Sequence, residues 1–349
     1  MEVLTGLGKT ILSTENEKQL LDQSVKTILA YKPILARILK ETAVECKDMS
    51  PDDIEVCIEG EVQISSIYVD SGLSNTEENN ISEKIDGLNT EAYINDEGLA
   101  RYDIRTYLRI PDSTGKKQIK LIINVESQNK DKPGYDISLR ALFYCCRMIS
   151  SQQEIEFTTN TDDPVKYGNI KKVYSIWICT STAEARANSV EKYDLRREFL
   201  FGHNDDNPRY DILTAVIVNV GRNCDPKDTE SALIRMLSVL FDKQITTTEK
   251  FNKLKNEHGL KLTKEIQEEV TTMCNYADAV EQEGINIGFK QGIEQGIEQG
   301  IKKSLAALVR SLKVYIKDFE SLYSAVISNE EYKDVTRDEV KNCLIQDQS

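Results

Sequence analysis

The chain has 349 residues, of which 40% are apolar, and it carries a formal net charge of −14. This length can bury one large hydrophobic core or two modest ones. No apolar run approaches the roughly 18 residues needed to cross a bilayer, and the opening MEVLTGLGKT lacks the apolar core of a signal peptide. We therefore expect a cytoplasmic protein without a membrane partner.

The cysteines and histidines indicate which kinds of metal site and catalytic site the chain is not expected to have. The eight cysteines include no C-x-x-C pair, and the two histidines, His203 and His258, lie in polar stretches. This pattern disfavours zinc sites, histidine-based nucleases and Ser-His-Asp triads. Any hydrolytic activity is expected to depend on carboxylates.

The N-terminal part is predicted to be helical first and extended afterwards. Residues 14–46 have helical apolar spacing interrupted by Pro33, which indicates two consecutive helices or one kinked helix. Residues 53–69 are expected to form one or two short strands. Residues 70–98 are polar, acidic and aperiodic, as expected for a long loop.

A hairpin is predicted next. Residues 101–110 alternate, with Tyr102 and Ile104 on one face and Asp103 and Arg105 on the other. A turn, PDSTGKKQ, separates this strand from an apolar second strand at residues 119–128.

The remaining elements complete the pattern αβββαβ. Residues 135–152 have helical spacing, and residues 171–181 form an apolar strand that we expect to be parallel to its predecessor because a helix intervenes. A strand at 210–221 and a helix at 229–242 follow. The helix at 135–152 is expected to direct inward Tyr135, Leu139, Leu142, Phe143, Cys146 and Ile149. This order predicts an α/β or α+β domain around a mixed sheet, spanning residues 1–245.

Residues 246–349 are predicted to form a helical C-terminal region. Its only internal repeat places glycine at every fourth residue from Gly284 to Gly300, each glycine followed by Ile or Phe. Five glycines inside a helix cost about 4–5 kcal/mol relative to alanine. Close packing of helices in a homo-oligomer is one explanation, and a flexible tether is the other.

The second strand of the hairpin ends in two polar residues, Glu126 and Gln128, which share a face. If the hairpin turns symmetrically about residues 114–115, paired residues sum to 229 and Asp103 lies opposite Glu126. Two opposed carboxylates repel each other, and Mg²⁺ (with Mn²⁺ as substitute) would remove that repulsion. The structural alternative is an ordinary pair of strand-end acids balanced by Arg105 or Lys120.

The charge around this hairpin is locally reversed. Residues 101–150 hold ten Lys or Arg against five Asp or Glu, a difference of +5 in an acidic chain. DNA is the partner that such a segment favours.

Longer stretches support a family assignment. The spacing D-x(22)-E-x-Q, followed by NKDKPGYDISLRALFYCCRMISSQ and IKKVYSIWICTS, resembles the PD-(D/E)XK nuclease superfamily. The lead-in EGLARYDIRTYL and the GIEQGIEQG repeat are similar to its transposase-like, recombination-promoting group. The resemblance covers about residues 20–245 and implies a restriction-endonuclease-like core with a mixed central sheet.

The resemblance assigns roles to three residues. Asp103 and Glu126 are expected to hold the metal, and Gln128 stands where the superfamily has a catalytic lysine. Glutamine supplies neither a positive charge nor a transferable proton. An upstream acid would complete the metal site, chosen from Glu41, Glu45 and Glu61.

Candidate DNA contacts lie just after the hairpin. Arg140, Tyr144 and Arg147 follow helical spacing and are predicted to form one polar stripe, which either contacts phosphates or is a solvated face. Lys130 and Lys132 flank the carboxylate pair and are expected to contact the DNA backbone.

These observations favour a Mg²⁺-dependent DNA endonuclease. One alternative is a catalytically degenerate nuclease fold that acts as an oligomeric DNA-binding or interaction module. A second alternative is an oligomeric scaffold in which the hairpin is purely structural.

Overall fold

A computed structural model of the chain describes residues 6–59, 62–64, 91–94, 98–111, 118–128, 133–152, 167–206, 210–221 and 229–345. The chain divides into two compact units, Met1–Ala279 and Val280–Ser349. The division falls later than the expected boundary at residue 245, because Leu254, Ile266 and Val270 are buried in the core of the first unit.

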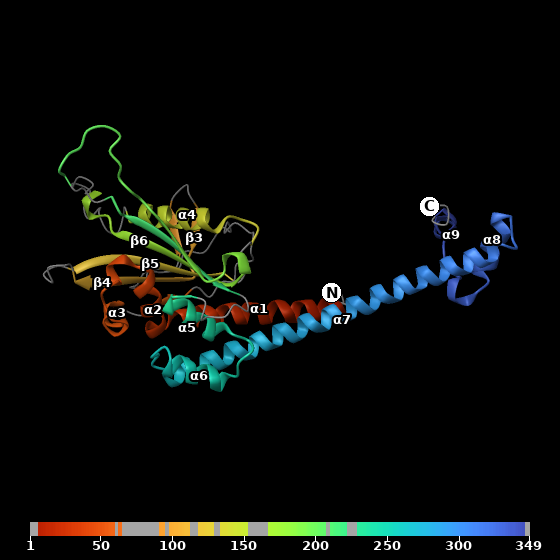
Figure 1. Cartoon of the computed structure of the whole chain (residues 1–349), viewed down its shortest axis with the longest axis horizontal. Helices are drawn as coiled ribbons and strands as arrows, with labels where there is room; N and C mark the ends of the chain where they lie inside the picture. The colour runs from red at the N-terminus through yellow and green to blue at the C-terminus, as the bar shows by residue number, and fades with distance from the viewer. Residues whose placement is uncertain are drawn as a thin grey trace. The chain divides into compact units, whose positions relative to one another are not determined.

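The first unit contains helices on both sides of a sheet (Figure 1). Its helices are α1 (Gly6–Ala30), α2 (Lys32–Thr42), α3 (Pro51–Cys57), α4 (Ile137–Ser150), α5 (Ala232–Phe241), α6 (Thr247–Asn256) and the beginning of α7 (Lys264–Lys313). Its strands are β1 (Gln63–Ile64), β2 (Glu91–Ile94), β3 (Gly98–Arg101), β4 (Ile104–Pro111), β5 (Gln118–Gln128), β6 (Lys172–Thr182), β7 (Ser189–Asp194) and β8 (Leu213–Gly221).

The main sheet is mixed, as predicted. Its order is β1-β4-β5-β6-β8-β7, and β2 pairs with β3 in a separate two-stranded sheet. The hairpin β4–β5 is antiparallel, and β5, β6 and β8 are parallel neighbours. The crossover through α4 accounts for the parallel pairing of β5 with β6. The α+β class with a mixed sheet is thereby confirmed.

The register of the hairpin also agrees with the prediction. Its pairs run from Ile104–Val125 to Pro111–Gln118, and every pair sums to 229. Asp103 and Glu126 therefore occupy the next opposing positions beyond the last ladder pair.

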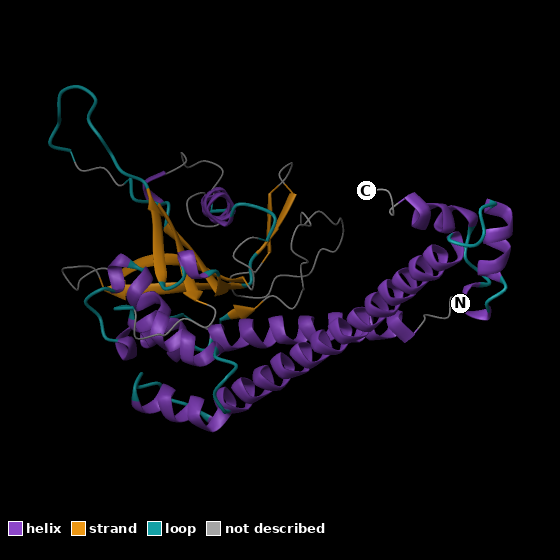
Figure 2. Cartoon of the chain, turned by 45° about the vertical axis from the view of Figure 1, so that its right-hand side comes forward, coloured by secondary structure: helices purple, strands orange, loops and turns teal. Residues whose placement is uncertain are grey.

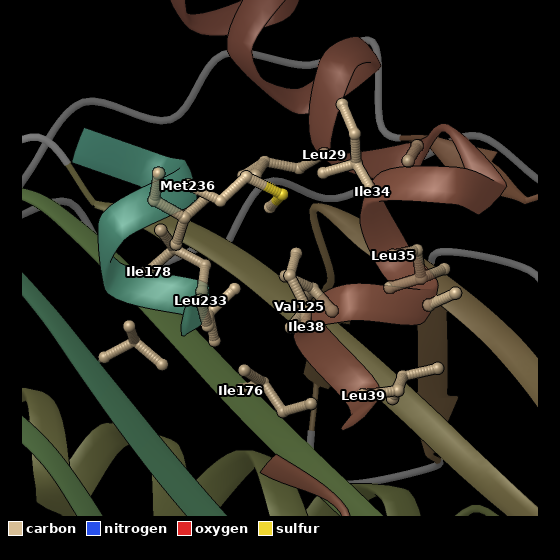
Figure 3. Close-up of a cluster of buried hydrophobic side chains, with 14 of the residues drawn as sticks. Leu29, Ile34, Leu35, Ile38, Leu39, Val125, Ile176, Ile178, Leu233 and Met236 are labelled. Atoms are coloured by element: carbon tan, nitrogen blue, oxygen red, sulfur yellow. The ribbon is translucent and has the colours of Figure 1, made fainter. Parts of the chain in front are cut away.

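Strand parity sorts the side chains of β5 onto two faces. Leu121, Ile123 and Val125 pack with α1, α2 and α5 in the larger core, part of which is drawn in Figure 3. Ile122 joins the smaller core with residues of α4, on the opposite face of the sheet. Figure 2 shows helices on both sides of this sheet. Asn124, Glu126 and Gln128 have the parity of Ile122 and therefore belong to the α4 face.

Two local predictions were wrong in this part of the chain. Residues 53–57, expected to be extended, belong to helix α3, because Pro51 follows a Ser50 side chain that accepts a hydrogen bond from the Asp53 amide. Tyr102 packs in the α4-side core and not beside Ile104, because β4 begins only at Ile104.

Helix α4 is rotated relative to the prediction. Leu139 and Phe143, expected to point inward, are 65% and 57% exposed. The buried residues of the helix are Ile137, Ala141, Tyr144, Cys145, Arg147 and Met148.

The second unit has its own small core. The end of α7 packs with α8 (Phe319–Ile327), a 3₁₀ turn (Glu330–Tyr332) and α9 (Arg337–Ile345) through a cluster that includes Leu305, Val309 and Val326. The glycine repeat lies within α7 and is helical throughout, so a flexible tether was the wrong alternative.

In the part of the chain that the structure describes, no helix combines the length and apolar character needed to span a bilayer.

Candidate active site at the carboxyl end of β5

Two hydrogen bonds from backbone amides to carboxylates link the ends of the two strands at Asp103 and Glu126. The Asp103 amide donates to Glu126 Oε1 at 3.1 Å, and the Ser127 amide donates to Asp103 Oδ2 at 3.0 Å. Asp103 immediately precedes β4, and Glu126 lies two residues before the end of β5. The ends of the two strands thus bring together the two acids predicted from the register.

Glu126 is buried, with 6% of its surface exposed. Burial, followed by the nearby charge of Asp103, raises the pKa of Glu126 well above its ordinary value, although Asp103's amide, Arg140 and Asn124 act in the opposite direction. A carboxyl group with this environment favours its neutral form until a cation is supplied. Perturbed carboxyl groups of this kind are frequent at functional sites.

A lysine from α1 reaches the same place. Lys26 is 4% exposed, and its Nζ lies 2.9 Å from Asp103 Oδ1 and 2.7 Å from Asp22 Oδ2. Burial acts to lower the pKa of Lys26, but the charges of Asp103 and Asp22 outweigh it and raise the pKa above its usual value. Burial also raises the pKa of Asp22, against the opposing effect of Lys26.

Sequence reasoning missed Lys26 and Asp22. Their separation by four residues places them on one face of a helix, next to Leu29 and Ala30, which are buried. A lysine on the apolar face of a helix, with an acid one turn earlier, was the available signal.

Gln128 is the last polar β5 residue on the α4 face, after Asn124 and Glu126. Its Oε1 accepts a hydrogen bond from the Tyr135 hydroxyl at 3.3 Å, and both side chains are half-buried. Two residues before Glu126, the buried Asn124 donates to Ser175 Oγ at 3.4 Å. The polar residues of β5 therefore form a continuous strip that ends at the carboxyl edge of the strand.

An arginine on α4 lies above this strip. The Arg140 guanidinium lies 4.7 Å from the ring centroid of Tyr135, 5.3 Å from that of Tyr144 and 5.7 Å from that of Trp177. Its Nη2 donates to the Tyr144 hydroxyl at 2.9 Å. The three aromatic rings hold the Arg140 guanidinium close enough to Glu126 for its positive charge to act to lower the pKa of that acid.

The predicted polar stripe on α4 was wrong. Arg140 is half-buried, but Tyr144 and Arg147 are buried, so the three do not form one solvated or DNA-facing surface. Trp177, against which Tyr144 packs, is buried. Lys130 and Lys132 lie outside the described residues.

Neither of the two suggested upstream glutamates that the structure describes, Glu41 and Glu45, lies at the pair. Glu41 accepts hydrogen bonds from Ser231 Oγ and the Leu233 amide at the start of α5. Glu45 pairs with Lys172 at 2.9 Å and accepts from the Tyr174 hydroxyl. Glu61 lies outside the described residues. The upstream acid that the structure links to Asp103 is Asp22, because both carboxylates form an ion pair with the Lys26 ammonium.

The donor set fits a divalent cation with two protein ligands. Among the described residues, no group of three or more His, Cys, Asp or Glu side chains is arranged to hold a metal. Mg²⁺ commonly takes one or two carboxylates and completes its shell with water and phosphate oxygens. The buried Glu126 and the partly buried Asp103 can supply these two carboxylates. The Lys26 ammonium currently neutralises Asp103 from the α1 side.

Comparison with protein-family models, curated proteins and solved structures finds no match to the chain.

Proposed function

We propose that the protein is a Mg²⁺-dependent DNA endonuclease with a PD-(D/E)XK-like core, of the transposase-like, recombination-promoting kind. The observation that carries this proposal is the meeting of two carboxylates at the carboxyl end of β5, where Glu126 accepts from the Asp103 amide and Asp103 accepts from the Ser127 amide. The mixed sheet, with its antiparallel hairpin followed by a helical crossover to a parallel strand, supports the same core.

Asp103 and Glu126 are the residues that would hold Mg²⁺ or Mn²⁺. When bound there, the cation would act as a Lewis acid on the phosphodiester. The raised pKa of Glu126 in the metal-free protein means that cation binding and loss of its proton are linked.

Gln128 would orient the attacking water or a phosphate oxygen. Its amide can donate through Nε2 while Oε1 remains bonded to Tyr135. It carries no charge, and Lys26 supplies the positive charge that a lysine at this position would otherwise bring. Lys26 therefore acts as a positioning residue that sets the orientation of Asp103.

DNA is the proposed substrate and partner. Support comes from the excess of five positive charges over residues 101–150. Lys130, Lys132 and the half-buried Arg140 remain proposed backbone contacts. Tyr144 and Arg147 are omitted from this set because they are buried.

We further propose that the repeat in α7 pairs two copies of the chain. Five apolar residues that follow the glycines are between 47% and 69% exposed: Ile285, Phe289, Ile293, Ile297 and Ile301. An antiparallel pair crossing at Gly292 would place every repeat glycine opposite a glycine and Lys290 opposite Glu294 of the other copy. Glycine permits such a close crossing, and the charges are complementary.

A degenerate, non-cleaving fold that binds DNA is the second candidate function. It is favoured by Gln128 and by the ammonium of Lys26, which already neutralises Asp103.

Nicking of supercoiled plasmid distinguishes the two functions. We expect wild-type protein to nick DNA with Mg²⁺ or Mn²⁺ but not with EDTA, and Asp103→Asn and Glu126→Gln to lose activity at least about 100-fold. Glu268→Gln, at an exposed ion pair of α7, is the matched control and should retain full activity. Metal-independent DNA binding without nicking would replace the endonuclease with the binding module.

A further inference from the structure

A second feature lies near Gln128: a cavity of about 250 Å³ between the start of α4, strand β7 and the carboxyl-terminal part of β8, which is antiparallel to β7. The polar residues that line it include Tyr135, Ser138, Arg186, Glu191, Tyr193 and Asn219. Ile137 and Ile217 supply apolar wall. In open α/β sheets, ligands favour this end of the parallel strands.

One carboxylate in the cavity is held rigidly. Glu191 Oε1 accepts from Asn219 Nδ2 at 3.0 Å, and Oε2 accepts from the Tyr193 hydroxyl at 2.8 Å. Asn219 is 1% exposed and also donates to Ser189 Oγ at 3.1 Å. Each oxygen of Glu191 keeps a second lone pair, so the carboxylate can accept two further hydrogen bonds from a ligand.

The cavity shares a wall with the candidate active site. Tyr135 lines the cavity, and its hydroxyl donates to Gln128 Oε1 at 3.3 Å. A group seated in the cavity would therefore lie one side chain away from Gln128.

The chemistry of the lining selects the ligand. A carboxylate accepts from two adjacent donors, and tyrosine rings and isoleucines favour a flat apolar body. The volume is smaller than the roughly 300–1,000 Å³ of pockets that hold drug-sized ligands, so it suits a single ring system. Two acids, Glu191 and Asp136, against one base, Arg186, make it a poor site for a bare phosphate.

We propose that this cavity receives one unstacked guanine of the DNA next to the scissile phosphate, a specificity that rests on the proposed nuclease function. Guanine presents N1–H and the N2 amino group side by side, and both donate to Glu191. Adenine and cytosine each present a ring acceptor beside their amino group, and that acceptor would face a carboxylate lone pair. Thymine presents one donor between two acceptors. The site therefore rejects the other three bases by leaving buried polar groups unpaired.

Binding of free mononucleotides tests the base pocket without requiring cleavage. We expect dGMP to bind the full-length chain about tenfold tighter than dAMP, dCMP or dTMP in calorimetric titration. Deoxyinosine monophosphate, which lacks the N2 amino group, should bind more weakly than dGMP. Glu191→Gln should remove the preference, and Tyr193→Phe, which keeps the ring, should reduce it. The control Glu184→Gln, exposed in the adjacent 3₁₀ turn Glu184–Arg186, should leave it unchanged.

Failure of the guanine site can be distinguished from failure of the proposed nuclease function. Asp103→Asn should abolish nicking and retain selective dGMP binding. Wild-type protein should nick DNA beside guanine, and Glu191→Gln should nick without this bias. Equal affinity for the four nucleotides, a preference unaffected by Glu191→Gln, or no binding at millimolar concentration would each overturn the guanine site, whether or not the protein cleaves DNA.

Discussion

The ammonium of Lys26, on α1, lies 2.9 Å from Oδ1 of Asp103, immediately before β4. This contact ties the first helix to the acid that begins the candidate site. The same ammonium lies 2.7 Å from Asp22, so one buried cation neutralises two acids.

Lys26→Met should destabilise the protein. It leaves two acids uncompensated, and breaking a buried ion pair costs roughly 3–5 kcal/mol. We expect about 3 kcal/mol, at the lower end, because the side chains of Asp103 and Asp22 are 17% and 27% exposed. Urea unfolding followed by the fluorescence of Trp177 measures the loss. The double variant Lys26→Met with Asp103→Asn should recover part of it, and strictly additive losses would contradict the pairing.

Glu126 should make the stability of the metal-free protein fall with rising pH. Its pKa is raised above the ordinary 4.5 in the folded state, so its contribution is fully present below pH 4.5 and is lost as the pH rises through the folded-state pKa. Glu126→Gln removes this dependence. In denaturant unfolding with EDTA, wild type and Glu126→Gln should therefore be equally stable near pH 4. At neutral pH the variant should be the more stable of the two, by about 1.4 kcal/mol for each pH unit by which the pKa of Glu126 is raised, counted up to that pH. A constant difference at every pH would refute the assignment, and Glu268→Gln serves as the control.

Glu41 is expected to matter for stability and not for cleavage. It accepts from the Leu233 amide and from Ser231, the residue that caps α5. Glu41→Gln should therefore cost about 1 kcal/mol, as loss of a helix cap does, and leave the nicking rate within about twofold of wild type. Thermal unfolding and plasmid nicking measure the two effects. Loss of nicking in a folded variant would return Glu41 to the metal site.

Alanine at the repeat glycines should have opposite effects on the stability of the single helix α7 and on the association of two copies of it. A Cβ built at any of the five glycines meets nothing within 4 Å in the described chain. Alanine at Gly288, Gly292 and Gly296 should thus stabilise the single helix by about 1 kcal/mol per site. The added methyl groups would hold two crossing helices apart, so sedimentation equilibrium should show a lower mass than for wild type. An unchanged oligomer would exclude the glycine face as the contact.

The register of the hairpin was predicted correctly because the assumed symmetric turn about residues 114–115 agrees with the observed ladder, which runs unbroken from Ile104–Val125 to Pro111–Gln118. Asp103 and Glu126 could therefore be paired from their positions alone. Lys26 could not be found in this way, because its place depends on which turn of α1 meets the end of β4.

The rotation of α4 was unpredictable for a different reason. The helix is apolar on two faces, with Leu139 and Phe143 outside and Ala141 and Met148 inside. Periodicity identifies a helix of this kind but does not choose its buried face. The choice follows from tertiary packing against Tyr102 and Trp177.

We propose that Asp103 and Glu126 form a divalent-cation site, and Mn²⁺ binding at pH 8 tests this site without requiring DNA cleavage. Titration monitored by the electron paramagnetic resonance of free Mn²⁺ should show tight binding to wild type, competed by Mg²⁺ and strongly weakened in Asp103→Asn and Glu126→Gln, with Glu268→Gln unchanged. Equal Mn²⁺ binding by wild type and both site variants, or no binding by wild type, would show that Asp103 and Glu126 do not form a cation site.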